Sequence, residues 1–364
     1  MSSNAPAETP QKYLGHLRSA APGFELDGER LAQYLQGRIA GFRGPLSISQ
    51  FDGGQSNPTY KLTAPGGMYV LRRRPPGVLL ASAHAVDREF RVISALFGVG
   101  FPVPEPLHLC LDESVIGSQF YVMRFVSGRV FWDCSMPDLS AAERAEVFDS
   151  VNATLAQLHS HDPERLGLHG FGRPTGYFER QIRRWSRQYE ASCSEDIPEM
   201  EKLIAWLPTA VPPDDGRCSV IHGDFSFHNV LIQPTSGCVA AVVDWELSTL
   251  GHPLGDLTYH LMEWYRPAGV DLRGTLRGRD LKRLGIPTLE EYVARYCERT
   301  GAELPATLPF YRAFNLFRFA AIAQGVASRA AAGNAAASNA TALGARVRPL
   351  AAAGWEEALA AGAG

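Results

Sequence analysis

Alternating apolar and polar positions dominate the first third of the chain, and helical spacing of apolar residues dominates the rest. Between residues 46 and 71, the β-rich runs LSISQF, TYKL and MYVLR are separated by two turns, DGGQSNP and PGG. Four apolar positions then follow helical spacing within residues 84–97: Val86, Phe90, Ile93 and Phe97. We therefore expect a meander of three strands followed by one amphipathic helix.

The pattern changes after residue 128. Before that point, residues 101–110 are extended and rich in proline, and residues 119–126 form a further strand. Beyond it, helix-period positions predict four helices, at residues 140–159, 177–189, 289–298 and 311–332. Three short apolar runs, CSVIHGD, NVLIQP and CVAAVVDWE, predict a hairpin-like set of buried strands, because β-branched residues dominate them. The expected fold class is α+β.

These patterns give domain boundaries. We expect an extension at residues 1–27, a small β-rich N-lobe at 28–128 and a larger, mostly helical C-lobe at 129–364. The Ala-rich segment 330–364 keeps helical period and charged residues, so a packed surface helix is expected there.

Composition restricts the function classes. With 45% hydrophobic and 20% charged residues, the chain has enough apolar material for a core, and a formal charge of −3 favours neither nucleic acid nor an anionic membrane as partner. The six cysteines form no CxxC pair, so neither a zinc site nor a disulfide framework is expected. Without a signal peptide or a long apolar run, we expect a soluble cytoplasmic protein.

The most specific signal is the loop HGDFSFHN at residues 222–229, followed by Asp244-Trp245-Glu246. Its H-x-D-x-x-x-x-N spacing supplies a carboxylate, Asp224, that can accept a hydroxyl proton, and an amide oxygen, Asn229, for a metal. Asp244 at the end of a buried strand adds a second metal ligand. Phosphoryl transfer needs the base and the metal ligands to be separate groups. The alternative is that Asp224 and Asn229 cap a turn and Asp244 caps a helix.

With these residues in place, the chain resembles the aminoglycoside phosphotransferase/choline kinase family, and within it the phosphotransferase domains associated with acyl-CoA dehydrogenases. The resemblance is carried by residues 51–60, 69–72, 82–90, 222–229 and 244–251. It implies a two-lobed protein-kinase-like fold that uses ATP and Mg²⁺, with Asp224 as catalytic base and Asn229 and Asp244 as metal ligands. It further implies that one loop covers the ATP phosphates: Gly53, Gly54, Gln55, Ser56 and Asn57.

Two more positions gain weight from their order in the chain. Arg72 stands where the kinase pattern has a lysine, and it keeps the positive charge. Glu89 lies beside the apolar face of its helix, where pairing with Arg72 would offset its burial. The alternatives are a plain hairpin turn for DGGQSN and a surface pair of Glu89 with Arg88 or Arg91.

By the same resemblance, residues 123–128 form the adenine-binding linker. Met123, Arg124 and Val126 are its candidates, with the carbonyl of Arg124 and the N–H of Val126 as the groups that hold the base; a plain strand end is the alternative. Asp256 and His222 are expected to support the catalytic loop.

A stripe of arginines is the sequence feature that bears on the nature of the acceptor. Arg180, Arg183, Arg184 and Arg187 fall on one face of the helix at 177–189, which suits an anion, although a solvated charged face is the alternative. A polycationic aminoglycoside would call for carboxylates instead. Phe131, Trp132 and residues 262–285 are further candidates for lining the acceptor pocket.

We therefore expect an ATP- and Mg²⁺-dependent small-molecule O-kinase. Its expected acceptor, by resemblance, is a hydroxyl of an anionic hydroxyacyl-CoA. Alternatives are an aminoglycoside or amino-alcohol kinase, and a nucleotide-binding pseudokinase that acts as a scaffold. The sequence leaves the oligomeric state open.

Overall fold

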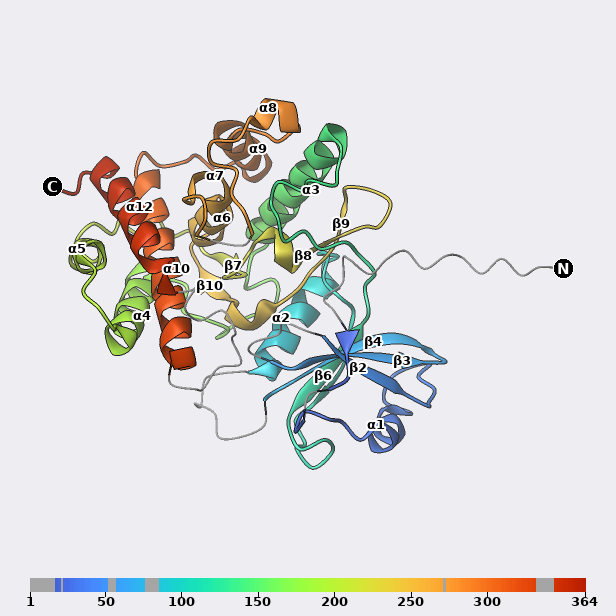
Figure 1. The fold of residues 1–364 in the computed structure, drawn as a ribbon. Coiled ribbons are helices and arrows are strands. Elements are labelled where there is room, and N and C mark those ends of the chain that lie inside the picture. The colour runs from blue at the N-terminus through green and yellow to red at the C-terminus, as the bar shows by residue number, and fades with distance from the viewer. Residues whose placement is uncertain (1–16, 21, 52–56, 76–84, 271–272, 332–343) are drawn as a thin grey trace. The chain divides into compact units, whose positions relative to one another are not determined.

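The computed structural model describes residues 17–20, 22–51, 57–75, 85–270, 273–331 and 344–364 (Figure 1). The chain divides into two compact units. One is made of Met1–Val130 and Val230–Glu246, and the other of Phe131–Asn229 and Leu247–Gly364. Among the described helices, none has the length and apolar character needed to cross a membrane.

The first unit is built on a six-stranded antiparallel sheet with strand order β1-β2-β3-β4-β6-β5. The strands are β1 (Leu17–Arg18), β2 (Ser47–Phe51), β3 (Thr59–Ala64), β4 (Gly67–Arg73), β5 (Pro106–Cys110) and β6 (Phe120–Arg124). The same unit contains the hairpin of β8 (Val230–Ile232) and β9 (Val239–Val242). This hairpin lies about a hundred residues beyond the sheet in sequence, and it carries Asp244 just after its second strand.

Alternation along the strands divides the sheet into two faces. On one face, Tyr69 and Leu71 of β4 join the core with Leu31 and Leu35 of helix α1 (Gly28–Leu35). The opposite face carries Arg72 and meets helix α2 (Val86–Gly98). The period of two therefore places the only charged position of the YVLR run on the side where α2 carries its buried carboxylate.

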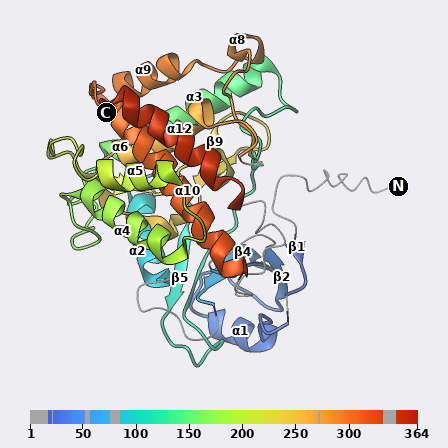
Figure 2. The ribbon, with the colours of Figure 1, turned by 60° about the vertical axis from the view of Figure 1, so that its left-hand side comes forward.

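The second unit is mostly helical (Figure 2). Its helices are α3 (Ala141–Ser160), α4 (Tyr177–Ser192), α5 (Pro198–Trp206), α6 (Leu254–His260), α7 (Met262–Tyr265), α8 (Leu281–Leu284), α9 (Leu289–Thr300), α10 (Leu308–Ala331) and α12 (Val347–Ala360). A two-stranded sheet joins β7 (Ser219–Ile221) to β10 (Thr249–Gly251), and the short helices η1 (Phe227–Asn229) and η2 (Trp245–Leu247) follow β7 and β9.

Helix α12 is the packed C-terminal helix that the sequence predicts. Leu350 and Ala351 are fully buried, and Arg312 of α10 pairs with Glu357 of α12. Gly354 lets the helices approach, because a Cβ there would lie 3.1 Å from Leu203 of α5. Part of the predicted segment, residues 332–343, lies outside the described residues.

The predicted α+β class, the three-strand meander, the strand at 119–126 and the long helices are confirmed. One expectation is wrong. The three short apolar runs do not form one hairpin-like set, because β7 pairs with β10 while β8 and β9 pair with each other. Residue composition correctly predicts that the runs form strands, but which strands pair depends on the path of the chain segments that connect them. The sequence patterns also missed the short helices α1, α5, α6, α7 and α8.

Candidate active site

In the first unit, Arg72 gathers three carboxylates from distant parts of the chain. Its Nε lies 2.9 Å from Glu89 Oε2, and its Nη2 lies 2.6 Å from Asp244 Oδ1 and 3.0 Å from Glu246 Oε2. The expected Arg72–Glu89 ion pair is thus present. The contacts to Asp244 and Glu246 were not predicted, since nothing local links β4 to a segment 172 residues later.

Charge within this cluster is unbalanced, with one guanidinium facing three acids. Glu89 is 2% exposed, and burial raises its pKa although Arg72 opposes that shift. Asp244, whose side chain is 36% exposed, has a left-handed backbone with φ 67°. Such a conformation is uncommon outside glycine and often marks a functional position. Asp244 is the most exposed of the three carboxylates around Arg72.

Other residues predicted to bind the nucleotide fall in the first unit. Gly53, Gly54, Gln55 and Ser56 lie outside the described residues. Asn57 is buried and donates from Nδ2 to Glu89 Oε1 at 2.6 Å, and Tyr121 donates to Glu89 Oε2 at 3.0 Å. The described end of the loop thus supports Glu89.

The predicted linker follows β6. Met123 is buried, while Arg124 and Val126 are half-buried. The backbone N–H of Arg124 donates to the Glu105 carbonyl at 2.8 Å, and its side chain pairs with the Glu105 carboxylate at 3.1 Å. Contact with adenine stays a prediction for all three residues.

The catalytic loop lies in the second unit and runs from β7 into η1. Asp256 of α6, fully buried, accepts the backbone N–H groups of His222 at 2.6 Å and Gly223 at 2.8 Å. The buried His222 ring in turn accepts the N–H of Asp224 at Nδ1, at 3.1 Å. Gly223 has φ 87°, and a Cβ there would lie 2.7 Å from the Leu247 carbonyl. Asp256 and His222 are therefore placed to hold the loop.

Asp224 is surrounded by donors and positive charge. Asn229 donates from Nδ2 to the Asp224 carbonyl at 2.9 Å and to Asp224 Oδ2 at 3.1 Å, so these contacts do not use its amide oxygen. Burial alone raises the pKa of Asp224, but His228, Arg273 and the Tyr259 hydroxyl outweigh burial and lower it below the ordinary value. Oδ1 of Asp224 is buried and has no hydrogen-bond partner among the described residues. The lowered pKa keeps Asp224 ionised at neutral pH, which is the form that can accept a proton.

Arg318 of α10 is a functional candidate that the sequence patterns missed. It is 3% exposed and donates from Nη2 to the Gly223 carbonyl, next to Asp224. Its guanidinium lies 5.0 Å from the Tyr259 ring and 5.6 Å from the Trp185 ring. Aromatic faces thus take the place that a carboxylate fills for most buried arginines. The sequence signal that could have identified Arg318 is its position among the apolar residues of the predicted helix at 311–332.

The four arginines of the predicted stripe on α4 have different surroundings, and their contact with an acceptor stays a prediction. Arg180 donates to the carbonyls of Arg173 and Thr175, just before its own helix. Arg184 lies over the Trp185 ring at 5.1 Å, and partial desolvation and the nearby Arg318 lower its pKa. Arg183, Arg184 and Arg187 are all exposed. Of the four, Arg184 lies near Arg318, whose Nη2 donates to the Gly223 carbonyl of the catalytic loop.

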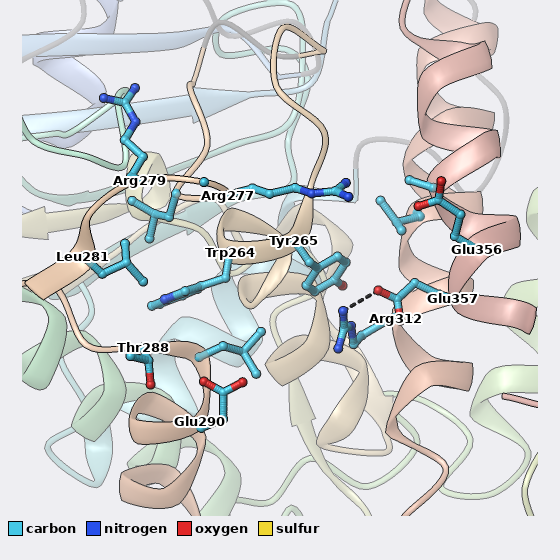
Figure 3. Close-up of a pocket in the computed structure, with 15 residues that line it drawn as sticks. Trp264, Tyr265, Arg277, Arg279, Leu281, Thr288, Glu290, Arg312, Glu356 and Glu357 are labelled. Carbon is cyan, nitrogen blue, oxygen red and sulfur yellow. Dashed lines mark hydrogen bonds and ion pairs between the residues drawn. The ribbon is translucent and has the colours of Figure 1, made fainter. Parts of the chain in front are cut away.

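A cavity of about 390 Å³ opens elsewhere in the second unit (Figure 3). Trp264 and Tyr265 of α7 lie in its centre, with Arg277 and Glu290 on opposite sides in this view. Part of the predicted segment 262–285 lines it, but Phe131 and Trp132 do not. Phe148 separates Trp264 from Phe227 of the catalytic loop, with ring centroids 5.6 Å and 4.8 Å away. This cavity is therefore not the place where Asp224 would meet an acceptor.

The donor set suits magnesium. Mg²⁺ prefers oxygen ligands and keeps several from water and phosphate. Asp244 has a second carboxylate oxygen beyond its Arg72 contact, and the Asn229 amide oxygen is not used on Asp224. The described residues contain no group of three or more His, Cys, Asp and Glu side chains able to hold a metal ion.

Comparison with known proteins agrees with this chemistry. Residues 47–314 match the model of the phosphotransferase enzyme family. The chain is 45% identical over 338 residues to acyl-CoA dehydrogenase family member 11 of Gallus gallus, covering 91% of this chain and 43% of that protein. The chain thus spans less than half of this relative.

Solved structures extend the comparison. A Ralstonia eutropha protein, provisionally named an aminoglycoside phosphotransferase, is 45% identical, with a TM-score of 0.83 over 92% of this chain and 99% of that one. Choline kinase of Cryptosporidium parvum shares the fold, at 11% identity and a TM-score of 0.62 over 92% of this chain and 96% of its own. The chain therefore belongs to the phosphotransferase enzyme family, whose protein-kinase-like fold serves ATP-dependent phosphoryl transfer.

Proposed function

We propose that this chain transfers the γ-phosphoryl group of ATP to a hydroxyl of a small, negatively charged acceptor, with hydroxyacyl-CoA as the favoured class. The bond between the γ-phosphorus and the bridging oxygen breaks, ADP leaves, and a P–O bond forms to the acceptor. The hydroxyl proton passes to Asp224. The observation that carries the proposal is the Asp224 carboxylate of the catalytic loop, which lies 3.9 Å from His228 Nε2 and is kept ionised by His228 and Arg273.

The nucleotide is proposed to use residues of the first unit. Gly53, Gly54, Gln55, Ser56 and Asn57 would cover its phosphates, Arg72 oriented by Glu89 would add positive charge, and Met123, Arg124 and Val126 would hold adenine. Asn229 and Asp244 would hold Mg²⁺, which neutralises phosphate charge when bound. The excess of carboxylates around Arg72 supports this assignment, because a cation would offset it.

The nature of the acceptor rests on charge. Arg273 acts on Asp224 electrostatically, and Arg318 and Arg184 lie close to the residues that support the loop. Positive charge of this kind attracts an anionic acceptor and repels a polycation. The acyl-CoA dehydrogenase relatives add a second, independent reason to favour a CoA thioester.

ADP formation measured with Mg·ATP against three acceptor panels tests the proposal. We expect turnover with hydroxyacyl-CoAs and little with aminoglycosides or amino alcohols. A better aminoglycoside or amino-alcohol substrate would overturn the acceptor class. Tight Mg·ATP binding without turnover on any panel would favour the scaffold alternative.

A further inference from the structure

Trp132 is the most exposed of the large hydrophobic side chains in the described part of the chain, at 59%. Its neighbour Phe131 is buried at 7%. One face of the Trp132 ring stacks on His228, with centroids 5.2 Å apart and planes 17° from parallel. A tryptophan fixed on one face and open to solvent elsewhere is ready to pack against a ligand.

Two loops hold this ring in place. The N–H of Cys134 donates to the Arg273 carbonyl at 3.1 Å, which ties the Trp132 loop to the Arg273 loop. Asp133 accepts from Ser135 within its own loop. Gly274, with φ 71°, makes the close approach possible, since a Cβ there would lie 3.0 Å from Asp133 Oδ1. Contacts between these two loops thus fix the position of Trp132.

The same assembly reaches the proposed base. His228 Nε2 lies 3.9 Å from Asp224 Oδ2, and Ser226 Oγ fixes the ring at Nδ1, 2.8 Å away. The Arg273 guanidinium lies over the Phe319 ring at 5.2 Å, with Nη1 3.4 Å from His228 Nδ1. The apolar Trp132 ring and the positively charged Arg273 guanidinium therefore both lie against the His228 imidazole, which is next to Asp224.

We propose that Trp132 and Arg273, arranged around His228, form the acceptor subsite beside Asp224. Trp132 packs against an apolar segment next to the reacting hydroxyl, and Arg273 attracts the negative charge of the acceptor. The ligand is thus an apolar, negatively charged hydroxy compound, a chemistry shared by hydroxyacyl-CoAs and free hydroxy acids. This inference rests on the proposed function and adds a specificity-determining residue to it.

Chain-length dependence tests the apolar contact. Initial rates are measured at saturating Mg·ATP with 3-hydroxyacyl-CoAs of increasing length, and in a second arm with the matching free acids. Burial of each methylene gives roughly three- to fourfold in affinity, so KM for the wild type falls by about that factor per carbon. In Trp132→Ala, this dependence flattens, while KM for ATP stays unchanged. The control Trp355→Ala, on α12, keeps the wild-type dependence. Persistence of the dependence in W132A overturns the subsite.

Calorimetric binding separates the two claims. Hydroxyacyl-CoA and the free acid are titrated into wild type, W132A and Arg273→Met. Weaker binding by both variants than by the wild type supports the subsite. This holds even if the wild type shows no turnover, because absence of turnover would overturn only the proposed function. The arm that binds identifies the source of the charge. Equal binding by wild type and W132A, or binding of kanamycin that depends on Trp132, overturns the inference.

Discussion

Two charged regions of this protein use the same residue types in opposite proportions. Around Arg72 in the first unit, one guanidinium meets the carboxylates of Glu89, Asp244 and Glu246. Around Asp224 in the second, one carboxylate meets His228, Arg273 and a tyrosine hydroxyl. The first region therefore places three carboxylates around one cation, whereas positive neighbours hold the single carboxylate of the second region ionised.

Under the proposed function, the difference assigns metal binding to one region and base catalysis to the other. A carboxylate that binds a metal directly is a poor base, because the metal occupies the oxygen that would take the proton, whereas a base must face the acceptor. The Asp224 region surrounds its carboxylate with positive neighbours, which keep it ionised. The Arg72 region instead leaves Asp244 partly exposed with its charge only partly offset. The following experiments test this comparison.

The largest effect is expected at Asp224. Asp224→Asn keeps the shape but removes the proton acceptor, so turnover should fall by ~10²–10⁴ while Mg·ATP affinity changes little. Coupled measurement of ADP release and calorimetry of Mg·ATP binding give the two quantities. Turnover close to wild type would show that another group takes the proton.

Support behind the catalytic loop is tested by pH. His260 packs on Phe225 and Phe227, and burial lowers its pKa to about 4. Below about pH 6.5, His260 is protonated in the unfolded chain but stays neutral in the folded chain. The free energy of unfolding therefore falls as the pH drops from about 6.5 to 4. The loss from this group reaches about 3 kcal/mol of unfolding free energy.

In His260→Gln, which can keep the contact with Tyr292, that part of the pH dependence should disappear. Urea unfolding at pH 7.0, 5.5 and 4.5 measures it, with the exposed His169→Gln as control. An unchanged pH slope in H260Q would contradict a neutral, buried His260.

A smaller but more specific effect is expected at Asp244. Asp244→Asn removes the negative charge of the proposed metal ligand. Loss of a residue that only orients a metal ligand already lowers metal affinity by roughly 10–100-fold, so loss of the ligand charge should cost at least as much. Mg·ATP binding should weaken by at least about tenfold. Glu246→Gln, in the same cluster around Arg72, is the matched control and should leave Mg·ATP affinity within about threefold. Equal losses in both variants would mean that total charge matters and not a ligand at Asp244.

The smallest effect concerns the arginine stripe. Because Arg183 and Arg187 are exposed, salt and water screen them, and Arg183→Glu with Arg187→Glu should raise KM for a CoA acceptor by a few-fold at low salt. The rise should shrink as salt increases, and KM for ATP should not move. A double variant of equal net charge elsewhere, Arg165→Glu with Lys282→Glu, is the control. Equal KM values for the two double variants would return the stripe to a solvated surface.

Sequence by itself determined the parts whose information is local. Strands with a period of two, helices with a period of 3.6 and the loop at residues 222–229 are each encoded within a few tens of residues. The pairing of Arg72 with Glu89 was predictable too, because a carboxylate beside an apolar helix face needs a cation. Backbone geometry and burial of single side chains were enough for these inferences.

Only the tertiary structure decided which distant segments meet. Asp244 reaches Arg72 across 172 residues, Arg318 reaches Gly223 across 95, and β7 pairs with β10 instead of joining the β8–β9 hairpin. No local pattern encodes these contacts, since many pairings satisfy the same periodicity and the choice depends on how whole elements pack. The stacking of Trp132 on His228 belongs to this group. Periodicity predicts which side a residue faces, whereas its partner is fixed only when the core closes around both.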